Sequence, residues 1–376
     1  MSRLTLAAAA LAFFGLVLPT RADDKPAPAK KPKVEVVFCL DTTGSMGGLI
    51  EGAKTKIWAI ANQIAAGKPT PDLKVGLVAY KDKGDDYVTK VIPLTDDLDT
   101  IHAELKKFKA QGGGDLPESV NQALDDSVNK IAWSKDKGVL KIIFLVGDAP
   151  PHMDYKDDVK YPETCKKAVE RDIIINTVQC GNDADCRKYW QDICKKAEGT
   201  YVQIAQEGGI VAIATPFDKD LGEINAELAR STVTYGDAKL RRAGEEKKAE
   251  AEKLSAAPAT APAAADRAGK IAKDGKVAAY DLIDAIKEKK VKLEDLKDED
   301  LPDDLRKMKP QERKAHLDKL EKKRDELTKK AGELDKKRGE FIDKKLKEDK
   351  KGGKDGFDNQ VVEMLRKQAK KYNIEY

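Results

Sequence analysis

Apolar runs of strand length alternate with segments of helical periodicity in the first part of the chain. These runs are residues 34–40, 74–80, 87–93, 140–147, 173–179 and 200–204. The first run is almost continuously apolar, which is typical of a strand covered on both faces in a parallel sheet. Most runs are separated by enough residues for a crossover helix. The order predicts an α/β fold with a doubly wound, mostly parallel sheet and helices on both faces.

One connection is too short for a crossover helix. Only residues 81–86, with the sequence Lys-Asp-Lys-Gly-Asp-Asp, separate the run that ends at Tyr80 from the run that begins at Tyr87. Six residues suit a hairpin, so this pair is predicted to be antiparallel and to lie at an edge of the sheet. Charged residues at such an edge hinder pairing with another chain.

The start of the chain has the pattern of a cleaved secretory signal. Arg3 precedes an apolar stretch at residues 4–18, and Thr20-Arg21-Ala22 resembles a cleavage site. The alternative is an uncleaved membrane anchor, but the stretch is shorter than the roughly 20 residues that span a bilayer, so cleavage is favoured. The pattern predicts a secreted or periplasmic protein from which residues 1–22 are removed, with residues 23–33 as a flexible lead-in.

The composition changes after the sheet domain, which is predicted to occupy residues 34–232. Lys, Glu and Ala dominate from about Lys239, and residues 256–265 are rich in Pro and Ala but poor in large apolar groups. Residues 233–268 are therefore predicted to form a charged helix and a linker, and residues 269–376 a helical region.

A seven-residue repeat in the helical region raises the question of a coiled coil. The repeated apolar residues are Leu320, Leu327, Leu334 and Phe341. Arg324 and Arg338 stand where a coiled coil places its second apolar residue, and Gly332 and Gly339 weaken the helix. A solvated helix that packs along one seam is therefore favoured over a coiled coil.

The charge of the chain argues against two classes of partner, nucleic acids and membranes. The formal net charge is +4, and it falls to +2 when Arg3 and Arg21 leave with the signal, which argues against nucleic-acid binding. Lysines of the helical region alternate with Glu and Asp, so membrane contact is not expected.

Export predicts disulfides among the five cysteines. Cys39 lies in an apolar run and is predicted to be a free core residue. Cys186 and Cys194 would lie roughly 12 Å apart on one helix, beyond disulfide reach. The predicted pairs are Cys180 with Cys186 and Cys165 with Cys194.

Three short segments carry the residues with metal-binding chemistry. Ligand sites of doubly wound sheets lie beyond the carboxyl ends of the strands, and the three segments are expected to gather there. They are Asp41-Thr42-Thr43-Gly44-Ser45, Gly112-Gly113-Gly114-Asp115-Leu116-Pro117-Glu118 and Gly147-Asp148-Ala149-Pro150-Pro151-His152. Carboxylate and hydroxyl oxygens suit a hard cation. The predicted metal ligands are Asp41, Thr43, Ser45, Asp115 and Asp148, with Mg²⁺ expected and Ca²⁺ or Mn²⁺ as alternatives.

Each segment also has an interpretation without a metal. Ser45 can start a helix, and Asp115 and Glu118 can form a capping box around Pro117. Asp148 can simply end a strand. His152 can reach the rim of the site, but stabilisation of its own loop is favoured over a catalytic or metal role.

The three segments together resemble the metal-ion-dependent adhesion site of von Willebrand factor A domains, and the strings around Asp115 and Asp148 resemble a bacterial secreted branch of that family. The resemblance covers roughly residues 34–232. It implies that the hydroxyls of Thr43 and Ser45 bind the cation directly, while Asp41 and Asp148 bind it or hold its waters. Asp115 stands where the family often has threonine, and Thr43 replaces the commoner serine.

The resemblance implies a module that binds a protein partner through an acidic side chain at the metal. A third carboxylate would weaken such capture, so Asp115 is expected to strengthen metal retention instead. No enzymatic activity is expected, because the second aspartate of a haloacid dehalogenase-type phosphotransferase is replaced by Thr43. The motifs G-x-S-x-G and G-x-x-x-x-G-K are absent. A metal-dependent hydrolase and an envelope structural protein acting through its helical tail are the alternatives.

Overall fold

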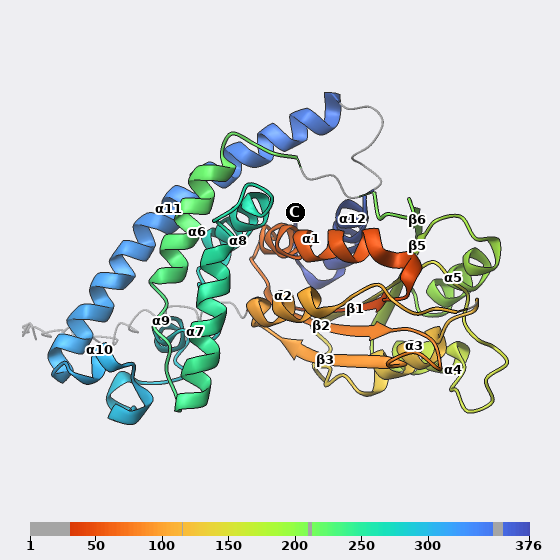
Figure 1. Ribbon diagram of the computed structural model, residues 1–376, viewed down its shortest axis with the longest axis horizontal. Helices are drawn as coiled ribbons and strands as arrows, with labels where there is room; N and C mark the ends of the chain where they lie inside the picture. Colours follow the sequence, from red (N-terminus) through yellow and green to blue (C-terminus); the bar gives the residue numbers. More distant parts are fainter. Residues whose placement is uncertain (1–30, 115, 210–212, 349–355) are drawn as a thin grey trace, which may run out of the picture. The chain divides into compact units, whose positions relative to one another are not determined.

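The computed structural model describes residues 31–376 except 115, 210–212 and 349–355. The predicted signal peptide and Asp115 lie outside the described residues. Six strands form one sheet in the order β3-β2-β1-β4-β5-β6 (Figure 1). Their bounds are β1 Lys33–Asp41, β2 Asp72–Tyr80, β3 Thr89–Thr95, β4 Val139–Gly147, β5 Ile173–Cys180 and β6 Tyr201–Ile204.

The pairing of the strands confirms the predicted fold class. β1 pairs in parallel with β2 and β4, and β4-β5 and β5-β6 are also parallel. β2 and β3 are antiparallel, and β3 is the edge strand that the short connection predicts.

Helices cover both faces of the sheet, and each face has its own apolar core. One core contains buried residues of α1 (Gly47–Ala65), α2 (Leu98–Lys107) and α12 (Phe357–Ala369). The other contains residues of α3 (Val120–Asn129), α4 (Tyr161–Glu170) and α5 (Ala184–Lys196). The central strands alternate between the two cores: Phe38 faces the first and Cys39 the second.

The last helix of the chain belongs to the first of these cores. Phe357 of α12 is 2% exposed, and its ring centroid lies 6.1 Å from that of Phe38. The final residues extend this contact, because Lys68 and Glu375 exchange two backbone hydrogen bonds of 2.8 and 3.0 Å. The end of the chain therefore packs with the sheet, although it follows a long helical segment.

That helical segment, residues 218–348, lies between β6 and α12 in sequence (Figure 1). Its α-helices are α6 Asp218–Arg230, α7 Ala238–Lys253, α8 Ala261–Asp274, α9 Leu282–Lys287, α10 Asp303–Arg306 and α11 Pro310–Glu348. Short 3-10 helices occur at Gly44–Met46, Leu293–Asp295, Asp298–Asp300 and Lys370–Tyr372. Within the residues that the structure describes, no helix is both long and apolar enough to cross a membrane.

The predicted Pro/Ala linker is wrong where it overlaps α8. Ala263, Ala264, Ala265 and Ala268 are buried, and α8 packs against α1, α6 and α11. A small side chain lets two helices approach closely, so alanines that would hold no core alone become a contact surface between neighbours. Gly269 extends this surface, because a Cβ there would overlap the carboxylate of Asp335 from α11.

α11 packs along one seam against other helices of the chain, as the sequence favours. Its buried residues, again seven apart, are Leu317, Arg324, Ala331 and Arg338. The leucines of the predicted repeat are half-buried beside them. Two arginines occupy this inner row because acidic residues from other helices face them.

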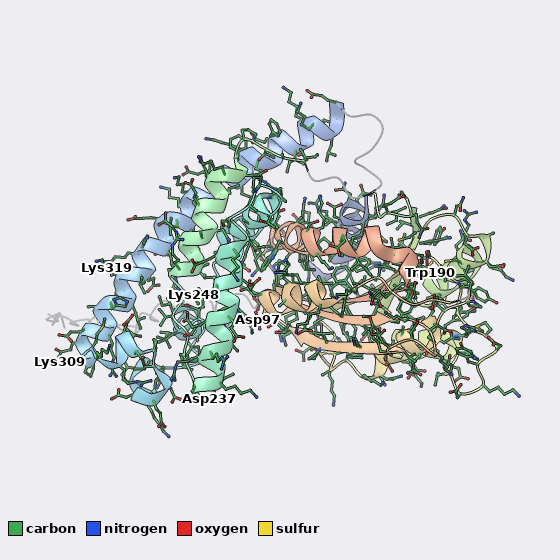
Figure 2. All side chains as sticks on the ribbon, in the orientation of Figure 1. Asp97, Trp190, Asp237, Lys248, Lys309 and Lys319 are labelled. Atoms are coloured by element: carbon green, nitrogen blue, oxygen red, sulfur yellow. The ribbon has the colours of Figure 1, made fainter. Side chains whose placement is uncertain are left out.

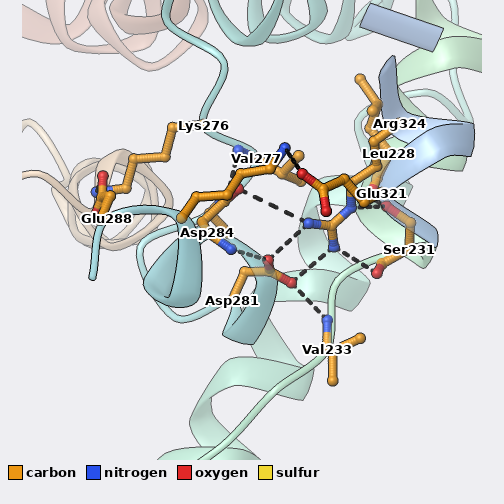
Figure 3. A network of polar contacts seen from close by, with 12 residues as sticks. Leu228, Ser231, Val233, Lys276, Val277, Asp281, Asp284, Glu288, Glu321 and Arg324 are labelled. Atoms are coloured by element: carbon orange, nitrogen blue, oxygen red, sulfur yellow. Dashed lines mark hydrogen bonds and ion pairs between the residues drawn. The ribbon is translucent and has the colours of Figure 1, made fainter. Parts of the chain in front are cut away.

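Arg324 illustrates how the helical segment holds a buried charge (Figure 3). Its guanidinium donates to both carboxylate oxygens of Asp281, at 2.7 and 2.8 Å, and to the hydroxyl and backbone carbonyl of Ser231. Asp281 also accepts a hydrogen bond from Val233 N, and Asp284 accepts from Val277 N. Arg338 pairs in the same way with Asp218 and Asp266. The buried charges are therefore matched and hydrogen-bonded.

Ion pairs also connect the helical segment to α2. Three acidic residues at the start of α2 face three cations, in the pairs Asp96–Lys276, Asp97–Lys247 and Asp99–Arg267. Figure 2 shows Asp97 at the end of α2 nearest α7. Arg267 is 1% exposed and also lies over the Trp58 ring of α1. The contact between segment and sheet domain is thus polar as well as apolar.

The predicted disulfides are wrong, because all five cysteines are free and buried. Cys180 packs in the core beneath α1 and Cys186 in the core on the other face, so the sheet separates them. The Cys165 thiol donates to Ile193 O, and the Cys194 thiol donates to Gln191 O at 3.3 Å. The prediction of Cys39 as a free core residue is confirmed.

Candidate metal centre

Two of the three predicted segments begin where neighbouring strands end. β1 ends at Asp41 and β4 at Gly147, and the two strands pair in parallel with Leu40 opposite Val146. Parallel register brings their carboxyl ends to one edge of the sheet. Gly147 sits between the two loops, since a Cβ there would lie 3.0 Å from the Asp41 Cβ and would overlap the Tyr80 hydroxyl. Asp41 and Asp148 are therefore neighbours.

The first loop folds back on its own aspartate. Asp41 Oδ1 accepts hydrogen bonds from Thr43 N at 2.8 Å and from Thr43 Oγ1 at 2.7 Å. The Thr43 and Ser45 hydroxyl oxygens lie 3.3 Å apart. Asp41 is fully buried, Thr43 is 2% exposed and Ser45 is exposed. One carboxylate and two hydroxyls thus share a turn that opens towards solvent at Ser45.

Two carboxylate oxygens of the predicted ligands are buried without a hydrogen-bond partner. They are Asp41 Oδ2 and Asp148 Oδ1. Burial, with the nearby charge of Asp148, raises the pKa of Asp41 to about 7. Unpaired buried carboxylates are costly, and a bound cation removes that cost by supplying the missing charge.

The glycine loop closes the site on a second side. Gly44 N donates to Gly112 O at 3.1 Å, and Gln111 N donates to Thr42 O at 3.2 Å. Gly113 has a φ of 74°, and a Cβ there would lie 2.9 Å from both the Thr43 Cβ and Glu118 Oε1. A side chain at this position would push the loop away from Thr43, so the glycine keeps the two loops in contact.

The contact with Gly113 places Glu118 in the site. Glu118 is not among the metal ligands predicted from the sequence. Glu118 is 2% exposed and its Oε2 has no hydrogen-bond partner. Burial, with the charges of Asp41 and Asp82, raises its pKa to about 9. The capping-box interpretation is wrong, because α3 begins at Val120 and the Glu118 carboxylate caps no helix. Glu118 could have been found from the sequence, because it ends the Gly-Gly-Gly-Asp-x-Pro-Glu string assigned to the site.

His152 stabilises its loop, as favoured from the sequence. It is 5% exposed, its Nδ1 lies 2.8 Å from Asp154 Oδ1, and its ring stacks on Tyr155 at 3.8 Å between centroids. Its backbone N donates to Glu118 O at 3.0 Å. The histidine therefore fixes the path of the third segment beside Glu118.

The donor set is mixed. Among the described residues, no three His, Cys, Asp or Glu side chains form a group that could hold a metal ion by themselves. The candidate site instead combines the Asp41 and Asp148 carboxylates with the Thr43 and Ser45 hydroxyls. Such oxygen donors fit Mg²⁺, which commonly keeps several waters and takes few carboxylates. The predicted ligand Asp115 lies outside the described residues.

Comparison with known families finds a similar domain. The family model described as the von Willebrand factor A domain matches residues 35–216. This part of the chain is similar to von Willebrand factor A domains. The matched stretch ends before the helical segment and before α12, whose Phe357 completes the core of the domain.

Several curated proteins resemble parts of the chain. The von Willebrand factor A domain-containing protein 7 of rat and of human is 37% identical over 120 residues, which is 32% of this chain and 12% of each relative. The N-acetyltaurine hydrolase of Bos taurus is 32% identical over 94 residues, which is 24% of this chain and 25% of that protein. The chain thus spans a quarter or less of the length of these relatives.

Two solved structures share a distant likeness with the chain. The crystal structure of the SpRpn10 VWA domain has a TM-score of 0.36 at 14% identity and covers 46% of this chain and 89% of that one. The proximal thread matrix protein 1 from the mussel byssus, solved with a zinc-occupied MIDAS motif, has a TM-score of 0.38 at 13% identity. That match covers 47% of this chain and 43% of the byssus protein.

Proposed function

We propose that the von Willebrand factor A domain binds one divalent cation, with Mg²⁺ preferred, through Asp41, Thr43, Ser45 and Asp148. The observation that carries the proposal is the pair of buried, unpartnered oxygens, Asp41 Oδ2 and Asp148 Oδ1. Glu118 would lose its proton beside a bound cation, and its carboxylate and, by its place in the sequence, that of Asp115 would then add negative charge that favours retention of the metal. Bound there, the cation supplies a positive charge that can attract an acidic group.

Calorimetric titration of Mg²⁺ into chelator-treated protein tests the proposal. Wild type is expected to bind one equivalent, and Ser45→Ala to bind more weakly because it removes one hydroxyl donor. Asp115→Thr is expected to loosen the metal if Asp115 supports retention. Wild-type protein that takes up no Mg²⁺, Ca²⁺ or Mn²⁺ would overturn the cation site, and unchanged affinity in Asp115→Thr would remove Asp115 from it.

We further propose that the cation mediates contact of an exported protein with a protein partner through an Asp or Glu side chain of that partner. Ser45 is exposed, so a ligand can reach this side of the site. Pull-downs from envelope extract in Mg²⁺ and in chelator, repeated with Ser45→Ala, test this role. A specific partner should be lost in both the chelator and the variant. Binding that survives both would assign the contact to another surface, such as the helical segment.

The proposal includes no catalytic step. Two polar residues beside the site have structural contacts: His152 Nδ1 lies 2.8 Å from Asp154 Oδ1, and Ser119 donates to Asp82. Ser119 is fully buried and therefore closed to a substrate. Metal-dependent hydrolysis of phosphoesters that disappeared in Asp41→Ala would establish an enzyme instead.

A further inference from the structure

Gln206 contacts two of the loops that form the metal site, although it comes from a different part of the chain. It follows β6 by two residues. Its Nε2 donates to Asp148 Oδ2 at 2.6 Å and to Ser45 O at 3.3 Å. Asp148 Oδ1, the other oxygen of the same carboxylate, is buried and has no partner. One oxygen of Asp148 is thus held by an amide while the other stays free.

The Gln206 side chain is itself tightly placed. Its Oε1 lies against Gly181, where any Cβ would overlap it, and Gly181 has a φ of 75°. Gly181 is fixed in turn by its N, which donates to Ile204 O at 3.0 Å. A glycine at this position leaves the space that the amide occupies.

The backbone on the other side of Gln206 is also anchored. Gly208 N donates to Ala205 O at 2.8 Å, which closes a turn around Gln206. Gly208 O accepts from Phe357 N at 3.0 Å, and Phe357 lies in the domain core. The amide therefore approaches Asp148 from a loop held at both ends, and few alternative positions are open to it.

We infer that Gln206 is a positioning residue of the cation site: its amide orients the Asp148 carboxylate so that Oδ1 is presented to the metal. The inference rests on the proposed cation site. Residues that hydrogen-bond a metal ligand fix its orientation, and their loss commonly lowers metal affinity about 10–100-fold. Mg²⁺ demands near-ideal octahedral geometry while Ca²⁺ tolerates irregular sites, so a loosened Asp148 should impair Mg²⁺ more than Ca²⁺.

The experiment compares Mg²⁺ and Ca²⁺ affinity by calorimetry in wild type, Gln206→Met and Gln203→Met. Methionine keeps the length and bulk of glutamine but has no amide donor. Gln203 is the matched control, because it lies on β6 and its side chain bonds Gly181 O and Arg187, neither of which is a proposed metal ligand. We expect Gln206→Met to weaken Mg²⁺ binding about 10–100-fold and Ca²⁺ binding less, with Gln203→Met close to wild type.

The outcomes separate this inference from the proposed function. Wild-type protein that binds neither ion overturns the cation site. If wild type and Gln206→Met bind Mg²⁺ with equal affinity, the cation site stands and the role of Gln206 is overturned. Equal loss in Gln206→Met and Gln203→Met, with an unchanged ratio of Mg²⁺ to Ca²⁺ affinity, would show that the loop matters only for packing and would also overturn it.

Discussion

Removing the Arg324 guanidinium should destabilise the helical segment strongly. Arg324 is 2% exposed, and its four hydrogen bonds go to Asp281 and Ser231 (Figure 3). Arg324→Met keeps the apolar stem but leaves Asp281, which is fully buried, without its countercharge. Breaking one partner of a buried pair costs about 3–5 kcal/mol, so the free energy of unfolding should fall by about that amount. Urea unfolding followed by circular dichroism measures it.

The pH dependence of this loss follows from Asp284. Burial and the charge of Asp281 raise the pKa of Asp284 to about 6, and Arg324 opposes that shift. A raised carboxyl pKa favours folding at pH below the unfolded value, and that contribution is lost as the pH rises through the folded value. Without Arg324 the pKa of Asp284 rises further, so the deficit should be larger at pH 8 than at pH 5.

Two further variants make the Arg324 prediction refutable. Arg242→Met removes an exposed arginine of α7 whose side chain is 84% exposed and pairs with Glu246, so it should cost less than about 1 kcal/mol. Asp281→Asn in the Arg324→Met background removes the uncompensated charge and should recover part of the loss. An Arg324→Met protein as stable as the Arg242→Met protein would refute the reasoning.

Three other predictions concern the core, the thiols and the metal-free state. Phe357→Ala should lower the free energy of unfolding by about 3–5 kcal/mol. The loss should be larger than in Phe341→Ala, which truncates a half-buried side chain of α11. A loss below about 1 kcal/mol in Phe357→Ala would show that α12 is not part of the core. All five thiols should react with a thiol reagent in denaturant without prior reduction, but slowly in the native protein; fewer than five would indicate a disulfide. Metal-free protein should lose stability from pH 6 to pH 9, because the raised pKa values of Asp41 and Glu118 make ionisation costlier in the folded state. Added Mg²⁺ should restore the lost stability. A melting temperature that rises over this pH range in the presence of chelator would contradict the prediction.

The sheet and the place of Asp41 and Asp148 at its edge are predictable from the sequence, because short local patterns indicate them. Apolar runs mark the strands, and the six residues 81–86 are too few for a parallel crossover. The carboxyl-end rule then places Asp41 and Asp148 together without any knowledge of side-chain contacts. These inferences need only the order of elements along the chain.

The features that sequence reasoning missed depend on distant partners. The alanines of α8 resemble a linker until α1 packs on them. Arg324 resembles a flaw in an apolar seam until Asp281, 43 residues earlier, faces it. Glu118 resembles a helix cap because its contact with the Gly113 loop exists only after folding. In each case the residue type alone gives the opposite expectation.

The most direct test of the cation site is to locate a metal in crystals of the protein. Mn²⁺ can replace Mg²⁺ at oxygen sites, and its anomalous scattering gives its position independently of the protein atoms. The account predicts one strong anomalous peak bounded by Asp41, Thr43, Ser45 and Asp148, absent from Asp41→Asn crystals. Mn²⁺ bound elsewhere, or no peak at this site in wild-type crystals soaked at millimolar concentration, would contradict it.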